Sequence, residues 1–293
     1  MLTRQRILLG LIERSGRPIG QTTLVKLAFL FGHETRMGHE GSFYDFLPYK
    51  FGPFSFTLYR EFDSLRQRGY LSPPGQDITI HKGARAAAKQ EIRNLPARTG
   101  RAVEEIVSRY SSLSHDAILK DVYKRYAWYS INTERSDLVS KRVARPTASA
   151  GTAYTAGYEG RSIDAFLNLL LVRGIAEIID VRANPVSRKY GFAGSRLCEL
   201  AGKVGIEYKH APKVGISSAE RRNLSSPASY ERLLNRYEQR LERTQAEEVA
   251  RLADLVAAKP SVFVCMESDP SCCHRTRLAR VISRLNGIEI EDI

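Results

Sequence analysis

Three of the four cysteines in this chain of 293 residues lie in the segment Cys265–Arg275, which also holds two acids and a histidine. A thiol at the N-terminus of a helix has a lowered pKa, because the free N–H groups there favour the thiolate. Cys273 is expected to occupy such a position, with His274 beside it as a base or hydrogen-bond donor. The segment therefore predicts thiol-based chemistry. Whether Cys272 or Cys273 is the functional thiol is left open.

The same residue types raise the question of a metal site. The thiols of this segment and His274, together with the more distant His210, offer the sulfur and nitrogen ligands that zinc takes in proteins. The spacing argues against chelation, because the adjacent residues Cys272, Cys273 and His274 cannot easily converge on one ion. We therefore expect no metal and no cofactor.

Further candidate residues follow predicted strands. Ligands of parallel α/β sheets bind beyond the carboxyl ends of the strands, so residues at these ends are expected to share one rim. The predicted catalytic residues are Asp180, His210, Cys265, Glu267, Cys273 and His274. The predicted substrate- or phosphate-binding residues are Gly157, Tyr158, Glu159, Gly160, Arg161, Arg182 and Arg275.

Each of these residues also has a purely structural interpretation. The Gly157–Gly160 pair can be a tight turn between a strand and a helix, and Asp180 with Arg182 can be a buried ion pair that stabilises the sheet. Cys198, alone on a predicted helix, is expected to pack in the core. The two interpretations separate on stability. If the rim is a site, Asp180→Asn or Cys273→Ser should abolish function with little loss of melting temperature.

The elements that must position this rim alternate along the second half of the chain. Strands are predicted at 153–156, 176–181, 206–210, 261–266 and 288–290, and helices at 163–173, 195–204, 230–258 and 273–285. Strand–helix–strand alternation at this spacing gives right-handed crossovers and a mostly parallel sheet. The fold class predicted is therefore α/β with a Rossmann-like sheet.

The first half of the chain predicts a mainly helical winged helix-turn-helix. Helices are predicted at 4–14, 21–31, 56–69, 85–94, 100–110 and 115–126, and a short hairpin at 70–80. Helix, helix, helix and hairpin is the order of that motif. Residues 136–152, rich in basic and small residues, read as a linker. The predicted domains are thus 1–135 and 153–293.

Charge is unevenly divided between the halves. Residues 1–150 carry 24 Lys and Arg against 14 Asp and Glu, a surplus of +10, whereas residues 151–293 carry 21 against 18, a surplus of +3. A basic half beside a nearly neutral one suggests that the first half binds a polyanion, and the alternative is a solvated basic surface without a partner. We expect nucleic acid as the partner, with DNA favoured over RNA.

Membrane and secretion signals are not found in the sequence. No run approaches the roughly 18–20 apolar residues that span a bilayer. Residues 1–15 carry arginines on both sides of a short apolar stretch, which is not the pattern of a signal peptide. We expect a cytoplasmic protein with reduced thiols and no membrane partner. The oligomeric state is left open.

Ordered motifs in the second half resemble a bacterial family, domain of unknown function 488 (DUF488). They are the Gly157–Arg161 turn, Asp180–Pro185, Tyr208–His210 with Pro212 and Gly215, and Cys265-x-Glu267-x-Asp269-Pro270-x-x-Cys273-His274-Arg275, in which Cys272 is extra. The resemblance implies a Rossmann-like fold over 153–293 and a small-substrate or nucleic-acid-related activity. Residues 1–135 are loosely similar to winged-helix relatives of the Panacea antitoxin domain, through Tyr49–Ser55, Gly69–Leu71 and Val122–Tyr129.

Three functions compete on these grounds. In the first, the winged helix binds DNA or RNA and the second domain processes a base or sugar, as in DNA repair or phage defence. In the second, the protein is a DNA-binding regulator or antitoxin-like protein whose second domain senses a ligand or partner without turnover. In the third, a cysteine is the nucleophile of a small-molecule sulfur or acyl transfer. Whether the protein is an enzyme is left open.

Overall fold

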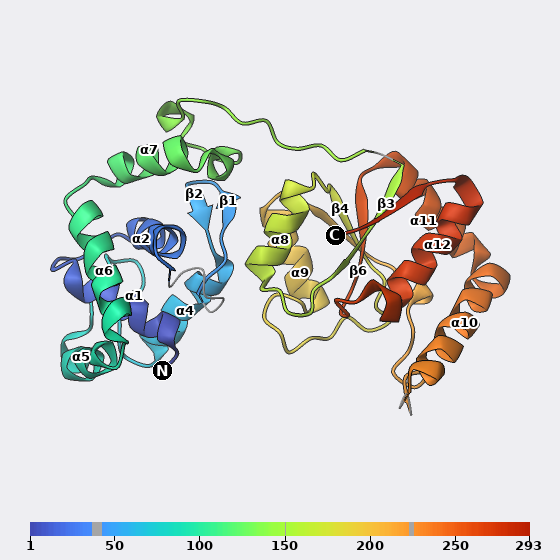
Figure 1. Cartoon of the computed structure of the whole chain (residues 1–293), viewed down its shortest axis with the longest axis horizontal. Coiled ribbons are helices and arrows are strands. Elements are labelled where there is room, and N and C mark those ends of the chain that lie inside the picture. The colour runs from blue at the N-terminus through green and yellow to red at the C-terminus, as the bar shows by residue number, and fades with distance from the viewer. Residues whose placement is uncertain (37–42, 150, 223–225) are drawn as a thin grey trace. The chain divides into compact units, whose positions relative to one another are not determined.

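The computed structural model describes residues 1–36, 43–149, 151–222 and 226–293. They divide into two compact units, Met1–Ala144 and Arg145–Ile293 (Figure 1). The boundary falls inside the segment 136–152 that reads as a linker. Among the described residues, no helix combines the length and the apolar character needed to cross a bilayer.

The N-terminal unit is mainly helical. Its elements are α1 (Thr3–Arg14), α2 (Gln21–Glu34), β1 (Leu47–Tyr49), β2 (Gly52–Phe54), α4 (Phe56–Gln67), η1 (Lys82–Ala84), α5 (Arg85–Arg93), α6 (Ala97–Tyr110), α7 (His115–Arg125), η2 (Ala127–Ser130) and η3 (Ser136–Leu138). The core is built from the apolar stripes of α1, α2, α4 and α6, which follow the helical period of the sequence.

The segment predicted as the wing is held by isolated antiparallel bridges, not by regular strands. Leu71 pairs with Ile80, and Ile78 pairs with Ile19 in the loop before α2. All four side chains are buried. The helical character of this unit is confirmed, and its classification as a winged helix stays a prediction.

The C-terminal unit is an α/β domain. Its elements are β3 (Thr152–Gly157), α8 (Ile163–Val172), β4 (Glu177–Asp180), α9 (Gly194–Lys203), β5 (Glu207–His210), η4 (Pro212–Val214), α10 (Pro227–Thr244), α11 (Ala246–Ala258), β6 (Ser261–Cys265), η5 (Pro270–Cys272), α12 (His274–Asn286) and β7 (Glu289–Asp292). The five strands lie in the order β5-β4-β6-β3-β7, and every pair is parallel. The predicted parallel α/β fold is confirmed.

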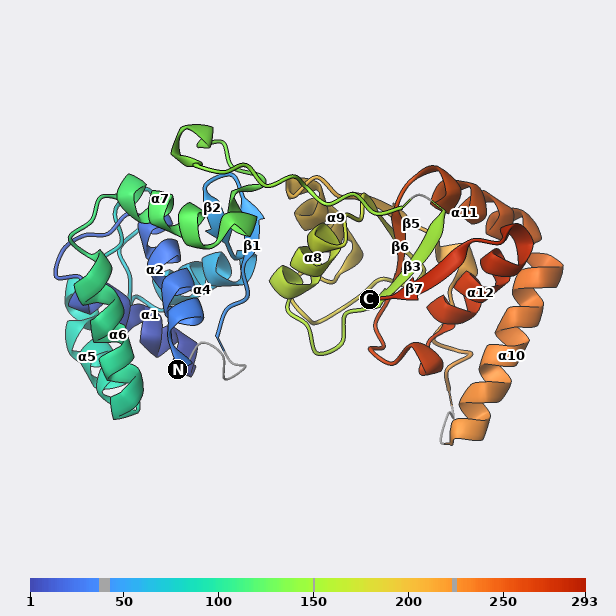
Figure 2. The ribbon, with the colours of Figure 1, turned by 45° about the horizontal axis from the view of Figure 1, so that its top comes forward.

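Both faces of this sheet are covered by helices. α8 and α9 lie on one face, and α11 and α12 lie on the other (Figures 1 and 2). The central strands β4 and β6 are therefore buried along their whole length, as expected for parallel strands between two helical layers. α8 begins where the Ser162 side chain accepts a hydrogen bond from the Ala165 amide.

Two expectations for this unit are wrong. The single helix predicted over 230–258 is two helices, because the backbone leaves helical geometry at Gln245 (φ −124°) and its side chain donates to the Lys213 carbonyl. The apolar period continues through the break on both helices, so the pattern does not reveal it. Cys198 on α9 is exposed, and so it does not pack in the core.

Candidate functional site

The carboxyl ends of four neighbouring strands carry residues that are predicted from the sequence to form the site. β5 ends at His210, β4 at Asp180, β6 at Cys265 and β3 at Gly157. These strands are adjacent in the order β5-β4-β6-β3. Because they are parallel, their ends share one edge of the sheet, which is where ligands of such folds bind.

At this edge Cys265, Glu267, Cys273 and His274 form a compact group, which we call the thiol cluster. Oε2 of Glu267 accepts hydrogen bonds from Cys265 Sγ at 2.8 Å and from Cys273 Sγ at 3.1 Å. Nδ1 of His274 lies 3.7 Å from Cys265 Sγ. One side-chain atom from each of the four residues lies within 4.8 Å of the others. The two cysteines and His274 are buried, whereas the Glu267 side chain is 27% exposed.

The local backbone explains how neighbouring residues reach one point. Cys265 is the last residue of β6, and the chain returns through the η5 turn to Cys273, which caps α12 in an extended conformation (φ −119°, ψ 137°). His274 is already helical. The change of backbone conformation between Cys273 and His274 turns both side chains into the cluster, while Cys272 is exposed and its thiol contacts Asp269. Of the adjacent cysteines, Cys273 is therefore the one in the cluster.

The imidazole of His274 is held in one orientation. Its Nε2 lies 3.0 Å from the Val181 carbonyl oxygen, an arrangement in which Nε2 carries the proton and donates it. Nδ1 then presents its lone pair to the cluster, where Arg221 Nη2 approaches it at 3.3 Å. The Tyr237 ring packs edge-on against the imidazole, with 5.5 Å between the two ring centroids. His274 therefore faces the thiols as an acceptor.

Burial and hydrogen bonding separate the pKa values of the acidic groups. The neighbouring Cys273 thiol stabilises a thiolate on Cys265 and lowers the pKa of Cys265 to about 5, although burial opposes this. Burial, and then the hydrogen bond to Cys265 and the charge on Cys265, raise the pKa of Cys273. For Glu267, burial is outweighed by hydrogen bonds from the thiols and by Arg221, which hold its pKa at about 2. Cys265 is thus the thiol that ionises first.

The predicted Gly157–Arg161 turn supports the Glu267 loop. A Cβ on Gly157 would lie 1.8 Å from the Glu267 carbonyl oxygen, so only glycine fits there. The amide of Glu159 donates to the Met266 carbonyl, and the Glu159 carboxylate accepts from the Ser268 amide at 3.2 Å. Gly160 takes a left-handed conformation at φ 76°. These contacts attach the Gly157–Arg161 turn to the loop that follows β6.

Two of the three arginines predicted to bind substrate or phosphate, Arg275 and Arg161, donate their hydrogen bonds to other groups of the protein. Arg275 is fully buried, and its guanidinium donates to the carbonyls of Glu267 and Ser268 and to Asp292. Arg161 donates to the carbonyls of Gly157 and Ile293. Both side chains therefore fix backbone at the sheet edge.

The buried residues Asp180, Arg182 and Tyr158 form a second group with the half-buried Tyr208, which we call the Arg182 network. Arg182 binds the Asp180 carboxylate through Nε at 2.8 Å and through Nη2, and it donates to Tyr158 Oη at 3.0 Å. Asp180 also accepts from Tyr208 Oη at 2.8 Å. Burial and the Asp180 carboxylate raise the pKa of Tyr208, which keeps this donor protonated. Asp180 is fully buried, and its contacts are those of a buried ion pair.

A short backbone segment joins the network to the thiol cluster. The Val181 carbonyl accepts from His274, and the next carbonyl, that of Arg182, lies 2.8 Å from Nε2 of the exposed His210. The structure therefore brings the predicted residues to one edge but divides them into two groups, with His210 beside the network.

A known protein family matches the part of the chain that forms most of this sheet edge. Residues 162–282 match the family model described as Domain of unknown function DUF488. The predicted resemblance is confirmed for this region, which contains β4, β5, β6 and the whole thiol cluster. No curated protein matches the chain. The match does not extend to the N-terminal unit, whose likeness to winged-helix proteins stays a prediction.

Two contacts in the DUF488 region could not be predicted from the sequence. Arg221 pairs with Glu267 at 2.9 Å and reaches His274, but it comes from the segment before α10, where no motif marks it. Lys189 donates from Nζ to the Tyr158 carbonyl at 2.9 Å. Tyr208, although part of the motif at the end of β5, was not assigned a role. Its position two residues before His210 places both side chains on one face of the strand.

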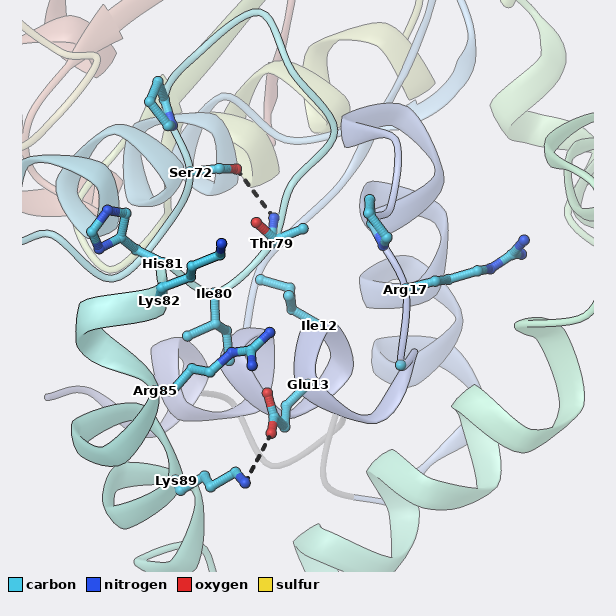
Figure 3. A pocket seen from close by; sticks show the side chains of 13 residues that line it. Ile12, Glu13, Arg17, Ser72, Thr79, Ile80, His81, Lys82, Arg85 and Lys89 are labelled. Carbon is cyan, nitrogen blue, oxygen red and sulfur yellow. Dashed lines mark hydrogen bonds and ion pairs between the residues drawn. The ribbon is translucent and has the colours of Figure 1, made fainter.

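A second candidate site lies in the N-terminal unit. A groove of about 640 Å³ runs between the loop after α1, the bridged segment 72–80 and the start of α5. Its charged lining residues are Arg17, Lys82, Arg85 and Lys89 against one acid, Glu13. Arg85 and Lys89 point toward Glu13 (Figure 3), and Lys89 pairs with it at 3.8 Å. All four cationic residues are exposed. We call this the basic groove.

Proposed function

We propose that this protein binds nucleic acid through the basic groove of its N-terminal unit and acts on it through the DUF488 region. The observation that carries the proposal is the composition of the groove, which has four exposed cations against one acid. Such a concave cationic surface suits phosphates, which supply most of the affinity of proteins for DNA and RNA. α5 begins at Arg85 beside the groove, so its N-terminal amide groups add to the positive potential there.

The division of charge supports the same assignment. The surplus of +10 in residues 1–150 compares with +3 in residues 151–293. In the second half, by contrast, arginines at the sheet edge donate to carbonyls and carboxylates of the protein. The first unit is therefore the one suited to hold a polyanion, and the thiol cluster of the second is suited to chemistry.

Binding is tested with the full chain and a fluorescently labelled DNA duplex, by anisotropy over a salt series. We expect tighter binding at low salt and a log–log slope of about −0.9 for each phosphate contacted. Changing Lys82 and Arg85 together to Glu should weaken binding and reduce the slope by about 1 for each lost contact. The matched control changes Lys120 and Lys124 to Glu, because both are exposed on α7 outside the groove. Equal losses in the two double variants would refute the groove as the binding surface.

Action on the polymer is tested separately. The protein is incubated with normal and damaged oligonucleotides of DNA and RNA, and the masses of the protein and of the oligonucleotide are then measured by mass spectrometry. Processing is supported if the unchanged protein and the control variant Asp269→Asn change the oligonucleotide mass and Glu267→Gln does not. Unchanged masses together with protection of one discrete DNA site would establish a regulator in place of a processing enzyme.

A further inference from the structure

We propose that the thiol cluster is a zinc site in which Cys265, Cys273, His274 and Glu267 are the ligands. Zinc in proteins is bound by thiolate, imidazole and carboxylate groups in a tetrahedron. The cluster supplies one atom of the required type from each of four residues, all within 4.8 Å of one another. This inference does not depend on nucleic-acid binding, which belongs to the other unit.

The distances in the cluster are close to those around an ion. Zinc–ligand bonds of about 2.0–2.3 Å place neighbouring ligand atoms roughly 3.3–3.8 Å apart. Cys265 Sγ and His274 Nδ1 lie 3.7 Å apart, within that range. Oε2 of Glu267 lies closer to the two sulfur atoms, at 2.8 and 3.1 Å. A small outward shift of this side chain, which is the exposed member of the set, would complete the tetrahedron.

The charges of the group also fit a divalent cation. Two thiols and a carboxylate converge in a buried place, where each thiol in its protonated form donates a hydrogen bond to Oε2 of the Glu267 carboxylate. On binding Zn²⁺ any thiol of the pair that is still protonated releases its proton to solvent, and both sulfur atoms bind the metal as thiolates. Two thiolates, the Glu267 carboxylate, Zn²⁺ and the paired Arg221 then sum to zero charge.

The surrounding contacts are those that orient metal ligands. A ligating histidine commonly donates its second ring nitrogen to a backbone carbonyl, as His274 does to Val181. Glu267 is held through its carboxylate by Arg221 and through its carbonyl by Arg275. The expectation of no metal rested on the adjacency of Cys272, Cys273 and His274. That ground does not apply, because Cys272 lies outside the cluster. Soft sulfur ligands favour zinc over magnesium or calcium.

The primary experiment measures metal content and affinity in the full chain. We expect about one zinc per chain after purification with zinc present, and Cys265→Ser or Cys273→Ser should lower the zinc affinity more than about 100-fold. Cys272→Ser is the matched control, and it should bind zinc as the unchanged protein does. Circular dichroism in each variant separates loss of the ligand from loss of the fold.

A second measurement needs no variant. Cobalt(II) added to the metal-free protein should give the near-ultraviolet charge-transfer band of thiolate ligation, and zinc should abolish it. With zinc bound, only Cys198 and Cys272 should react promptly with a thiol reagent. Failure of the metal-free, folded chain to bind zinc or cobalt would overturn the proposal. So would equal zinc affinity in Cys272→Ser and Cys273→Ser, or a Cys265–Cys273 disulfide as the native state.

Discussion

The backbone of Gly157 lies directly against the backbone of Glu267, so close that a Cβ on the glycine would lie 1.8 Å from the Glu267 carbonyl oxygen. This contact joins the end of β3 to the loop that carries the carboxylate of the thiol cluster. Close packing of two backbones leaves no flexible side chain that could move aside. The position of Glu267 therefore depends on a residue that bears no functional group.

Gly157→Ala is expected to destabilise the protein by at least about 2 kcal/mol, because the added methyl group must displace the Glu267 loop. The measurement is the free energy of unfolding in urea. Gly202→Ala in α9 is the control, since a Cβ there meets nothing within 4 Å. Equal stability of the two variants would mean that the two backbones are not in contact.

Asp180→Asn is expected to destabilise the protein by about 3–5 kcal/mol, because it leaves the buried Arg182 guanidinium without its carboxylate. This outcome is the one expected of a structural ion pair. Glu199→Gln removes a carboxylate from exposed ion pairs with Arg196 and Lys203, and it should leave the stability nearly unchanged. If Asp180→Asn instead melts like the unchanged protein while activity is lost, Asp180 belongs to the catalytic residues.

Arg221→Ala is expected to leave the fold intact and to lower the zinc affinity about 10-fold, because the arginine orients Glu267 and does not itself bind the metal. Competition with a chromogenic chelator measures the affinity. The neighbouring, exposed Arg222 supplies the control variant Arg222→Ala. Unchanged zinc affinity in Arg221→Ala would remove Arg221 from the site.

The stability of the N-terminal unit is expected to rise with pH above neutrality because of Lys26. This lysine is buried on α2, and burial lowers its pKa to about 7. The unfolded chain, with a lysine pKa near 10.5, binds more protons than the folded chain between about pH 7 and 10.5, so raising the pH across this window stabilises the fold. Thermal unfolding from pH 7 to 10 should show this rise.

The matched variants for that measurement are Lys26→Met and Lys120→Met. Lys26→Met should lose the rise, whereas Lys120→Met on the exposed face of α7 should keep it. If Lys26→Met follows the same pH profile as the unchanged protein, Lys26 is charged inside the fold at neutral pH.

The strand ends at the sheet edge could be predicted because they depend on local patterns. Alternating strands and helices establish the parallel sheet, and the sheet places residues such as His210 and Cys265 at one edge. The partition of those residues into two groups could not be predicted, because it depends on which donor groups form hydrogen bonds within the protein. For example, nothing in the sequence indicates that the guanidinium of Arg275 donates to the backbone carbonyls of Glu267 and Ser268.

Spacing arguments also failed where the backbone changes conformation. The adjacency of Cys273 and His274 suggests diverging side chains, but an extended residue followed by a helical one turns both inward. Arg221 lies 46 residues before Glu267, and only the tertiary fold brings them together. The break at Gln245 was hidden because the apolar period continues across it.

The order of the strands has a consequence for the assembly of the α/β unit during synthesis. β6 lies between β3 and β4, although it follows both in the chain. Until Ser261–Cys265 has been made, β3 and β4 have no central strand to pair with, and their apolar residues remain exposed. Pairings between strands so distant in sequence form slowly, because the intervening loop must close first. The newly made chain is therefore most prone to aggregate between the completion of β4 and the arrival of β6.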